Sequence, residues 1–269
     1  MLTSRHRSLF SLILLFGIMS MPFARSVSNV KHKHLYIIRH GQAMHNPRAE
    51  VAKDAGCSME EFIELMRQDD AMDADLTGLG KVQATSVERP DHLSSHVQLV
   101  VSSPLSRALE TADLVHSASE CSTRVCVETW REINGMLLNA QRRTVTELNH
   151  KFPQWNFDGI AETDELWTPK IEEFDACAER GYQGLCWLME RPEECILLVA
   201  HGGILRFTMN MHPHVKLVDQ RTGANEKPIE SRFDNCELRR YTLSWEEDEE
   251  GGEDNDSGGK RPIVLTQVD

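Results

Sequence analysis

The sequence predicts an α/β fold: one three-layer domain with a mostly parallel sheet and helices on both faces. Three short, predominantly apolar runs at 35–38, 97–101 and 195–199 are typical of strands buried on both sides. Helix-like segments separate these runs, and strands that alternate with helices favour a parallel sheet with helices packed on each face. Because residues 30–245 contain neither an internal repeat nor a linker, we expect a single domain.

The remaining elements follow from local signals along the chain. Thr77 is a typical N-cap for a helix that continues to about residue 88, and Pro90 ends it. Pro104 suits the first turn of the next helix, because proline lacks the N–H that a first turn leaves unpaired. Further helices are expected near 59–66, at 171–190 and after 203, and further strands at 125–127 and 236–243.

The chain of 269 residues has an ordinary globular composition but an acidic balance. Hydrophobic residues make up 40 % and charged residues 26 %, which excludes a wholly disordered or multi-span membrane protein. A net charge of −13 argues against general nucleic-acid binding, which requires cations against the phosphate backbone. Eight acidic residues and one lysine lie within 246–260, so we expect residues 246–269 to form an acidic, disordered tail after a folded domain at 27–245.

The first 26 residues have the pattern of a signal peptide or targeting segment. Arg5 and Arg7 precede an apolar run at 9–19, and small residues at 24 and 26 suit a cleavage site. An uncleaved anchor or the front half of a bipartite organelle signal are the alternatives. The run is shorter than the roughly 20 residues that cross a bilayer, so we expect no stable membrane span in the mature chain and a secreted or secretory-pathway protein.

Seven cysteines leave at least one thiol unpaired within the chain. Cys121 and Cys126 flank a short polar loop and are close enough in sequence to bridge, whereas buried apolar thiols are favoured for most of the others. The sequence contains no Cys-x-x-Cys, so zinc-ribbon and thioredoxin-type sites have no support.

Candidate catalytic residues follow the predicted strands. His40 and His201 each follow a buried strand directly, and the carboxyl ends of parallel strands meet at one edge of a sheet. Arg39, Arg107 and Glu132 are expected at the same edge. Guanidinium groups bind phosphate oxygens in pairs, a neutral imidazole is a competent nucleophile near pH 7, and a carboxylic acid protonates a leaving oxygen. This set indicates phosphoryl chemistry.

Four segments in the right order resemble the histidine phosphatase superfamily, in its phosphoglycerate-mutase-like branch. The resemblance extends over about residues 33–243, and two further segments, 162–167 (Glu-Thr-Asp-Glu-Leu-Trp) and 235–239 (Asn-Cys-Glu-Leu-Arg), are similar to plant-type mutase-like proteins. The four segments are 35–42 (Leu-Tyr-Ile-Ile-Arg-His-Gly-Gln), 75–80 (Asp-Leu-Thr-Gly-Leu-Gly), 103–112 (Ser-Pro-Leu-Ser-Arg-Ala-Leu-Glu-Thr-Ala) and 199–203 (Val-Ala-His-Gly-Gly).

The resemblance implies a role for each candidate. His40 would attack phosphorus and become a phosphohistidine, while Arg39, Arg107 and His201 would line the phosphate pocket. Glu132 would donate the proton and then activate water. The arginines would supply the positive charge of a metal ion, so neither a metal nor another cofactor is implied.

Further residues are assigned to substrate binding, and one acid competes with Glu132. Asn46 would contact phosphate, and Gly41 would permit a close backbone approach. Arg142 and Arg143 follow the acid and would hold a second anionic group of the substrate, with Arg206 as a similar candidate; Glu128 is the competing acid.

The function expected from these residues is that of a metal-independent phosphatase, which hydrolyses a small phosphate monoester through a phosphohistidine intermediate. A phosphoglycerate mutase-type phosphoryl transfer is the enzymatic alternative. An inactive scaffold that binds a phosphorylated ligand is the alternative from another class, although the intact Arg-His-Gly and His-Gly-Gly sequences argue against it.

Overall fold

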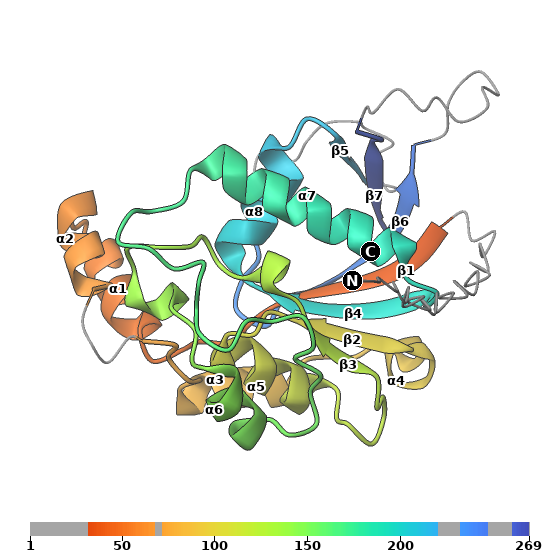
Figure 1. Ribbon diagram of the computed structural model, residues 1–269, viewed down its shortest axis with the longest axis horizontal. Coiled ribbons are helices and arrows are strands. Elements are labelled where there is room, and N and C mark those ends of the chain that lie inside the picture. Colours follow the sequence, from red (N-terminus) through yellow and green to blue (C-terminus); the bar gives the residue numbers. More distant parts are fainter. Residues whose placement is uncertain (1–31, 68–71, 220–231, 247–259, 269) are drawn as a thin grey trace, which may run out of the picture.

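The computed structural model describes residues 32–67, 72–219, 232–246 and 260–268, which form one seven-stranded sheet with helices on both faces (Figure 1). The strands are β1 (His32–Arg39), β2 (Leu99–Ser102), β3 (Arg124–Cys126), β4 (Cys195–Ala200), β5 (Val215–Asp219), β6 (Leu238–Trp245) and β7 (Ile263–Gln267), in the order β3-β2-β4-β1-β6-β7-β5. β6 is antiparallel to both neighbours, and the other pairs are parallel. The predicted α/β fold with a mostly parallel sheet is confirmed.

Eight α-helices are described. They are α1 (Asn46–Asp54), α2 (Met59–Leu65), α3 (Gly78–Thr85), α4 (Asp91–His96), α5 (Ser106–Val115), α6 (Val145–Lys151), α7 (Phe174–Glu190) and α8 (Gly202–Met211). Thr77 caps α3 as predicted, because its hydroxyl accepts a hydrogen bond from the Gly80 N–H. The helix predicted from Pro104 begins two residues later, at Ser106. None of the described helices has the length and hydropathy of a membrane span.

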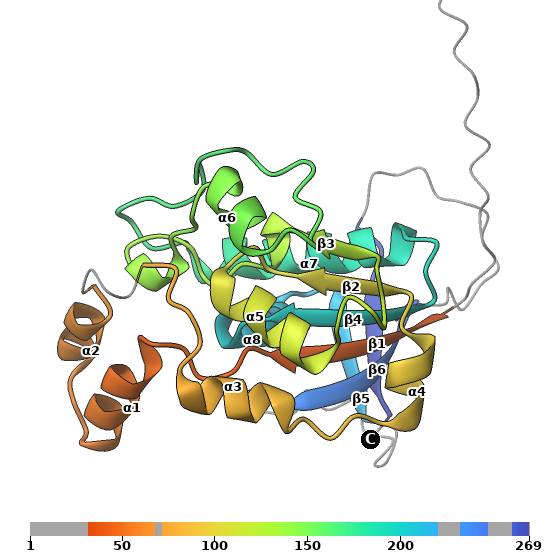
Figure 2. The same ribbon diagram turned by 90° about the horizontal axis from the view of Figure 1, so that it is seen from below.

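Two hydrophobic cores lie on opposite faces of the sheet. Leu35 and Ile37 of β1 face the core beneath α7 and α8, whereas Tyr36 and Ile38 face the core that α3, α4 and α5 cover (Figure 2). All four side chains are buried, so β1 has no solvent-facing side over this run. This double burial explains why the strand is apolar throughout and does not alternate.

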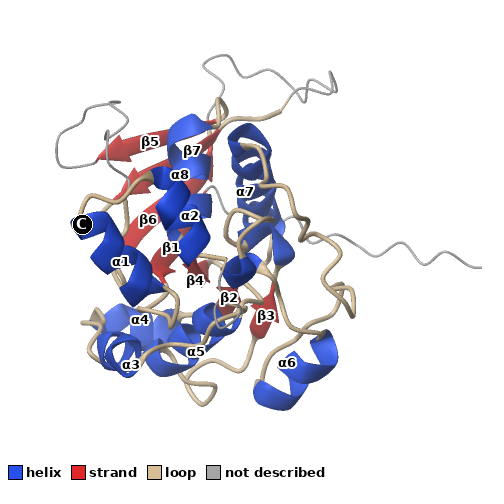
Figure 3. Cartoon of the chain, turned by 90° about the vertical axis from the view of Figure 1, so that its left-hand side faces the viewer, coloured by secondary structure: helices blue, strands red, loops and turns tan. Residues whose placement is uncertain are grey.

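The strand order brings the candidate site residues to one edge. β2, β4 and β1 are neighbours, with Ser102 opposite Val199 and Arg39 opposite Ala200 at their carboxyl ends. His40 and His201 therefore follow adjacent strands at the same level. Helices α1 and α2 extend beyond this edge (Figure 3) and contact each other, with Arg48 donating a hydrogen bond to the Leu65 carbonyl at 3.3 Å.

The prediction of a disordered tail is wrong for the C-terminal residues 263–267. Residues 263–267 form β7, which lies between β6 and β5, and Ile263 and Leu265 are completely buried. This strand follows a strongly acidic run, and its two inward side chains give too short a pattern to stand out in the sequence. The folded domain thus extends to residue 268, while the expected leader at 1–26 and most of the acidic segment lie outside the described residues.

We expect Leu265→Ala to lower the free energy of unfolding by about 2–5 kcal/mol, because the change leaves a cavity in the core beneath α7 and α8. Thr266→Ala, on the other face of the same strand and half-buried, is the matched control and costs less than about 1 kcal/mol. Urea denaturation of both variants measures this difference. Equal stability of the two would contradict a structural role for β7.

Candidate active site

His40 has a defined tautomer. Its ring is 2 % exposed, and its Nδ1 lies 2.7 Å from the Gly41 carbonyl oxygen. Because a carbonyl oxygen only accepts hydrogen bonds, Nδ1 carries the proton. The lone pair is therefore on Nε2, which accepts a hydrogen bond from Arg107 Nε at 3.2 Å. Nε2 is the nitrogen available for nucleophilic attack.

Buried donors without partners gather around this imidazole. The His40 and His201 rings lie 4.9 Å apart, and neither nitrogen of His201 has a hydrogen-bond partner among the described residues. Arg107 Nη2 and Arg39 Nε are likewise buried and unpartnered. Buried polar atoms without partners are costly, so such a group indicates a place where a ligand supplies the acceptors. Several donors around one point suit the oxygens of a phosphate group.

The Glu132 carboxylate lies at the N-terminus of α8, the helix that begins directly after His201. Its carboxylate accepts hydrogen bonds from the backbone N–H groups of Gly203 at 3.2 Å and Ile204 at 3.1 Å. A Cβ at position 203 would lie 2.1 Å from Glu132 Oε1, so the second glycine of the His-Gly-Gly sequence is needed for this approach. The carboxylate is thereby held at the start of the helix that follows His201, and its charge acts on Arg107.

The competing acid, Glu128, is engaged elsewhere. Its carboxylate forms ion pairs with Arg131 at 3.2 Å and with Arg142 at 2.8 Å. Arg131 is in turn paired with Asp164 through two bonds of 2.7 Å. Two arginine partners neutralise Glu128, so the geometry favours Glu132 as the acid of the site.

Burial and neighbouring charge keep the histidines neutral. Desolvation, followed by the positive charge of Arg107, holds the pKa of His40 and of His201 well below the ordinary value. Desolvation also lowers the pKa of Arg107 to about 10, although Glu132 and Asp73 act against this shift. At neutral pH the site therefore combines an uncharged imidazole with a charged guanidinium.

The buried carboxylate of Asp73 positions the helix that carries Arg107. Asp73 accepts hydrogen bonds from the backbone N–H of Ser106 at 2.7 Å and from its hydroxyl at 2.8 Å, at the first residue of α5. Arg143 donates to the same carboxylate and to the Asp73 carbonyl, both at 2.8 Å. Asp73 thus fixes the start of the helix that carries Arg107 in its first turn.

The expectation that Arg142 binds substrate is wrong. Its side chain is buried, with Nε on Glu128 and with Nη2 donating to the carbonyls of Ala161 and Thr163. This guanidinium fastens the 161–163 segment and has no group free for a ligand. Arg143 is engaged with Asp73, so the structure does not support its predicted contact with a second anionic group either.

The substrate-binding roles predicted for Gly41 and Asn46 have different outcomes in the structure. A Cβ at Gly41 would lie 2.6 Å from the Gly80 carbonyl oxygen, so the predicted close approach exists but is made to the first turn of α3. Asn46 begins α1, and its side chain lies outside the described part of the structure.

The sequence analysis did not select His45, which the structure places in the site. Its side chain is 4 % exposed, and its Nδ1 has no hydrogen-bond partner among the described residues. Desolvation and then the charges of Arg107 and Arg39 hold its pKa well below the ordinary value. The available signal was a second histidine five positions after His40, on the segment that leaves the same strand end.

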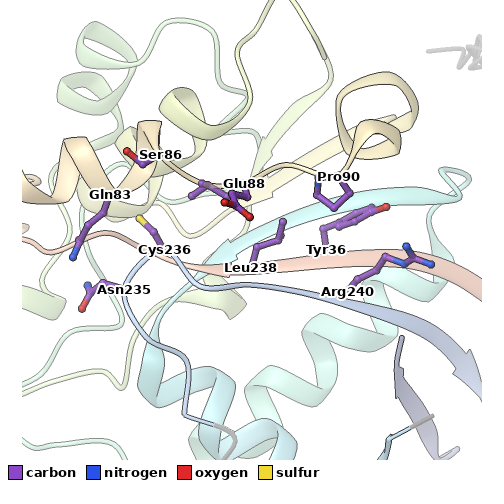
Figure 4. Close-up of a pocket in the computed structure, with 10 residues that line it drawn as sticks. Tyr36, Gln83, Ser86, Glu88, Pro90, Asn235, Cys236, Leu238 and Arg240 are labelled. Carbon is purple, nitrogen blue, oxygen red and sulfur yellow. The ribbon is translucent and has the colours of Figure 1, made fainter. Parts of the chain in front are cut away.

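Asn235 lies in a segment that carried part of the resemblance, but no role was expected for it. Asn235 donates a hydrogen bond from Nδ2 to the His40 carbonyl at 3.0 Å, and Cys236 N–H donates to the Arg39 carbonyl at 3.0 Å. The same two residues line a separate hollow of about 480 Å³ between α3 and β6 (Figure 4). Asn235 and Cys236 therefore lie between the backbone of Arg39 and His40 and this hollow.

The model of the histidine phosphatase superfamily (branch 1) matches residues 35–223, which is more than half of the chain. The protein belongs to this superfamily. Phosphoglycerate mutase-like protein 1 of Arabidopsis thaliana is 32 % identical over 248 residues, covering 78 % of this chain and 81 % of the relative. Phosphomutase-like protein 3 of Candida albicans is 28 % identical over 205 residues, covering 70 % and 63 %.

Solved structures of phosphatases have a similar fold. The mycobacterial glucosyl-3-phosphoglycerate phosphatase in complex with VO3 is 18 % identical, with a TM-score of 0.46, covering 87 % of this chain and 96 % of that one. The ecdysone phosphate phosphatase from Bombix mori in complex with tungstate is 14 % identical, with a TM-score of 0.48 and coverage of 78 % and 88 %.

The seven cysteines of this superfamily member are free thiols. Cys121 and Cys126 are both buried and do not form the bridge that their spacing allows. Burial raises the pKa of Cys195 to about 11 and that of Cys236 to about 12, which favours the unreactive thiol form.

The three buried histidines of the site predict a pH-dependent stability. Below about pH 6.5, His40, His45 and His201 gain protons in the unfolded chain, whereas their lowered pKa values keep them neutral in the folded protein. The unfolded state then binds more protons, so the free energy of unfolding falls with falling pH, by up to about 1.4 kcal/mol per pH unit for each histidine.

Urea denaturation at several pH values from 7.5 to 5 measures this slope. We expect His45→Gln to make it shallower than in the unchanged protein, because groups elsewhere contribute equally to both. Identical slopes would show that His45 is not buried as a neutral imidazole.

Proposed function

We propose that this protein is a phosphatase that hydrolyses a small phosphate monoester through a phosphohistidine on His40. The observation that carries the proposal is the surrounding of His40 Nε2, which bears the lone pair, by the unpartnered buried donors of Arg39, Arg107 and His201. These donors suit the three equatorial oxygens of a phosphoryl group in transfer. The positive charge of the two arginines supplies what a metal ion supplies in other phosphoryl-transfer sites.

The proposed reaction has two steps. In the first, His40 Nε2 forms a bond to phosphorus while the bond to the ester oxygen breaks, and the leaving oxygen takes a proton from the Glu132 carboxyl group. In the second, a water molecule attacks the phosphohistidine, Glu132 takes its proton, and the bond between phosphorus and Nε2 breaks. Inorganic phosphate leaves, and both residues return to their starting forms.

His40→Ala removes covalent catalysis and should lower kcat on p-nitrophenyl phosphate at least about a thousandfold. Exposed His150 of α6 provides the control variant, His150→Ala, which retains activity. Rapid quenching of the unchanged protein with labelled substrate should trap protein-bound phosphate that is stable in alkali and labile in acid. Substantial turnover by folded His40→Ala would rule out the proposed nucleophile.

Glu132→Gln should reduce activity far more on an alkyl phosphate than on p-nitrophenyl phosphate, because a good leaving group needs little protonation. Glu128→Gln, which breaks ion pairs without touching the site, serves as the comparison and should affect both substrates equally. The ratio of kcat/KM values for the two substrates is the measurement. Equal losses for Glu132→Gln would remove it from the role of acid.

The alternative of a mutase is supported by the names of the relatives from Arabidopsis thaliana, which are phosphoglycerate mutase-like proteins. A mutase returns the phosphoryl group from the histidine to a second acceptor, whereas a phosphatase gives it to water. Incubation with 3-phosphoglycerate and a trace of its bisphosphate separates these outcomes: release of inorganic phosphate without 2-phosphoglycerate supports the phosphatase.

A further inference from the structure

A cleft of about 450 Å³ opens from the phosphate pocket toward the α1–α2 pair. Arg39, Glu132, Gly202 and Gly203 form its inner end, so it begins at the acid and at one of the phosphate-binding arginines. Its volume is in the range of small-molecule sites and leaves space for a leaving group beyond the phosphate itself. Its remaining walls come from α1, α2, α8 and the segment before β6.

The outer walls carry more positive than negative charge. Lys53 of α1, Arg206 of α8 and Arg232 line the cleft and are exposed, and no carboxylate among the described residues pairs with any of them. Asp234 is the acidic side chain that opposes them on the rim. In a chain with a net charge of −13, three unpaired cations around one cleft are a local reversal of charge that favours an anion.

The walls between these cations are apolar. Phe62 of α2 and Phe207 of α8 are half-buried in the cleft, and Met66 and Ala49 line the wall on the side of α1 and α2. Phe207 also stacks on Phe174, with ring centroids 4.6 Å apart and planes 14° from parallel, which fixes its orientation. Two aromatic side chains in one cleft, one from α2 and one from α8, suit a flat apolar group better than a polar three-carbon chain.

We propose that the cleft selects a phosphate monoester whose leaving group has a flat apolar body and a second anionic group. The phosphate would lie on His40, the apolar body between Phe62 and Phe207, and the second anion near Lys53 and Arg206. Arg206 was already a candidate for this role in the sequence, and Lys53 takes the place expected for Arg142 and Arg143. The inference rests on the proposed phosphatase activity, because the cleft has this use only where the phosphate ester is cleaved.

Two matched probes test the anion site: 4-carboxyphenyl phosphate and its neutral analogue 4-carbamoylphenyl phosphate. Lys53→Gln and Arg206→Gln should each lower kcat/KM for the carboxylated probe about five- to tenfold more than for the amide. The difference should shrink at about 300 mM salt, because exposed charges are screened. Lys81→Gln, an equal charge change on exposed α3 outside the cleft, is the control and should affect neither probe.

A second comparison tests the apolar walls. Phe62→Ala should lower kcat/KM for 4-carbamoylphenyl phosphate at least fivefold more than for glycerol 3-phosphate, which has no ring to bury. Phe62→Leu keeps the bulk of the side chain and removes the aromatic face, so it covers the case in which the alanine variant does not fold. We expect the leucine variant to show the same selectivity in smaller degree.

The outcomes separate the two proposals. If the unchanged protein hydrolyses none of the three esters, the proposed phosphatase function fails. If it hydrolyses them, and Lys53→Gln and Arg206→Gln lose activity equally on the charged and neutral probes, the anion site is overturned while the phosphatase function stands. Equal losses on aryl and glycerol esters for both Phe62 variants overturn the apolar part of the site.

Discussion

The hydrogen bond from His40 Nδ1 to the Gly41 carbonyl decides which ring nitrogen carries the lone pair, and the surrounding backbone holds that segment in place. Gly41 N–H donates to the Thr111 hydroxyl at 3.0 Å, and Asn235 holds the carbonyl of His40. The Gly80 carbonyl leaves no space for a side chain at Gly41, and the Gln42 carbonyl leaves none at Gly80. Elements far apart in the chain thus converge on three residues, 39–41, because a small rotation of this segment would turn the lone pair away from the pocket.

The site holds the charged guanidinium of Arg107 at a place from which water is excluded. Arg107 is completely buried, and the carboxylates that offset its desolvation, Glu132 and Asp73, approach it from different sides. A bound phosphate dianion would accept hydrogen bonds from the guanidinium N–H groups that these carboxylates do not pair with. Binding of an oxyanion would satisfy these buried donors without rearranging the sheet.

The fold and the core of the site could be predicted because both depend on local patterns. Buried parallel strands are short apolar runs, and residues that directly follow them must lie at the sheet edge, which places His40 and His201. The resemblance already favoured Glu132 over Glu128 as the acid, and the ion pairs of Glu128 support that choice.

What the sequence could not provide was the set of partners of each charged side chain. Arg142 and Arg206 are both arginines near expected site segments, yet one is buried among carbonyls and the other lines an open cleft. Such a difference depends on contacts between distant segments, for which local spacing has no signal. His45 was missed for a related reason, since the turn that buries it leads into helices that pack outside the main sheet.

The position of β7 has a consequence for how the chain is made. β5 is an edge strand of the described sheet and is joined to it through β7, while β1 pairs with β6 about 200 residues later. During translation, β1 leaves the ribosome long before its antiparallel neighbour β6 exists, and β5 can join the sheet only after β7 has been synthesised. The growing chain must therefore keep the apolar runs of β1, β2 and β4 from aggregating until β6 and β7 have been made, and a truncation before residue 263 would leave an exposed edge at β6.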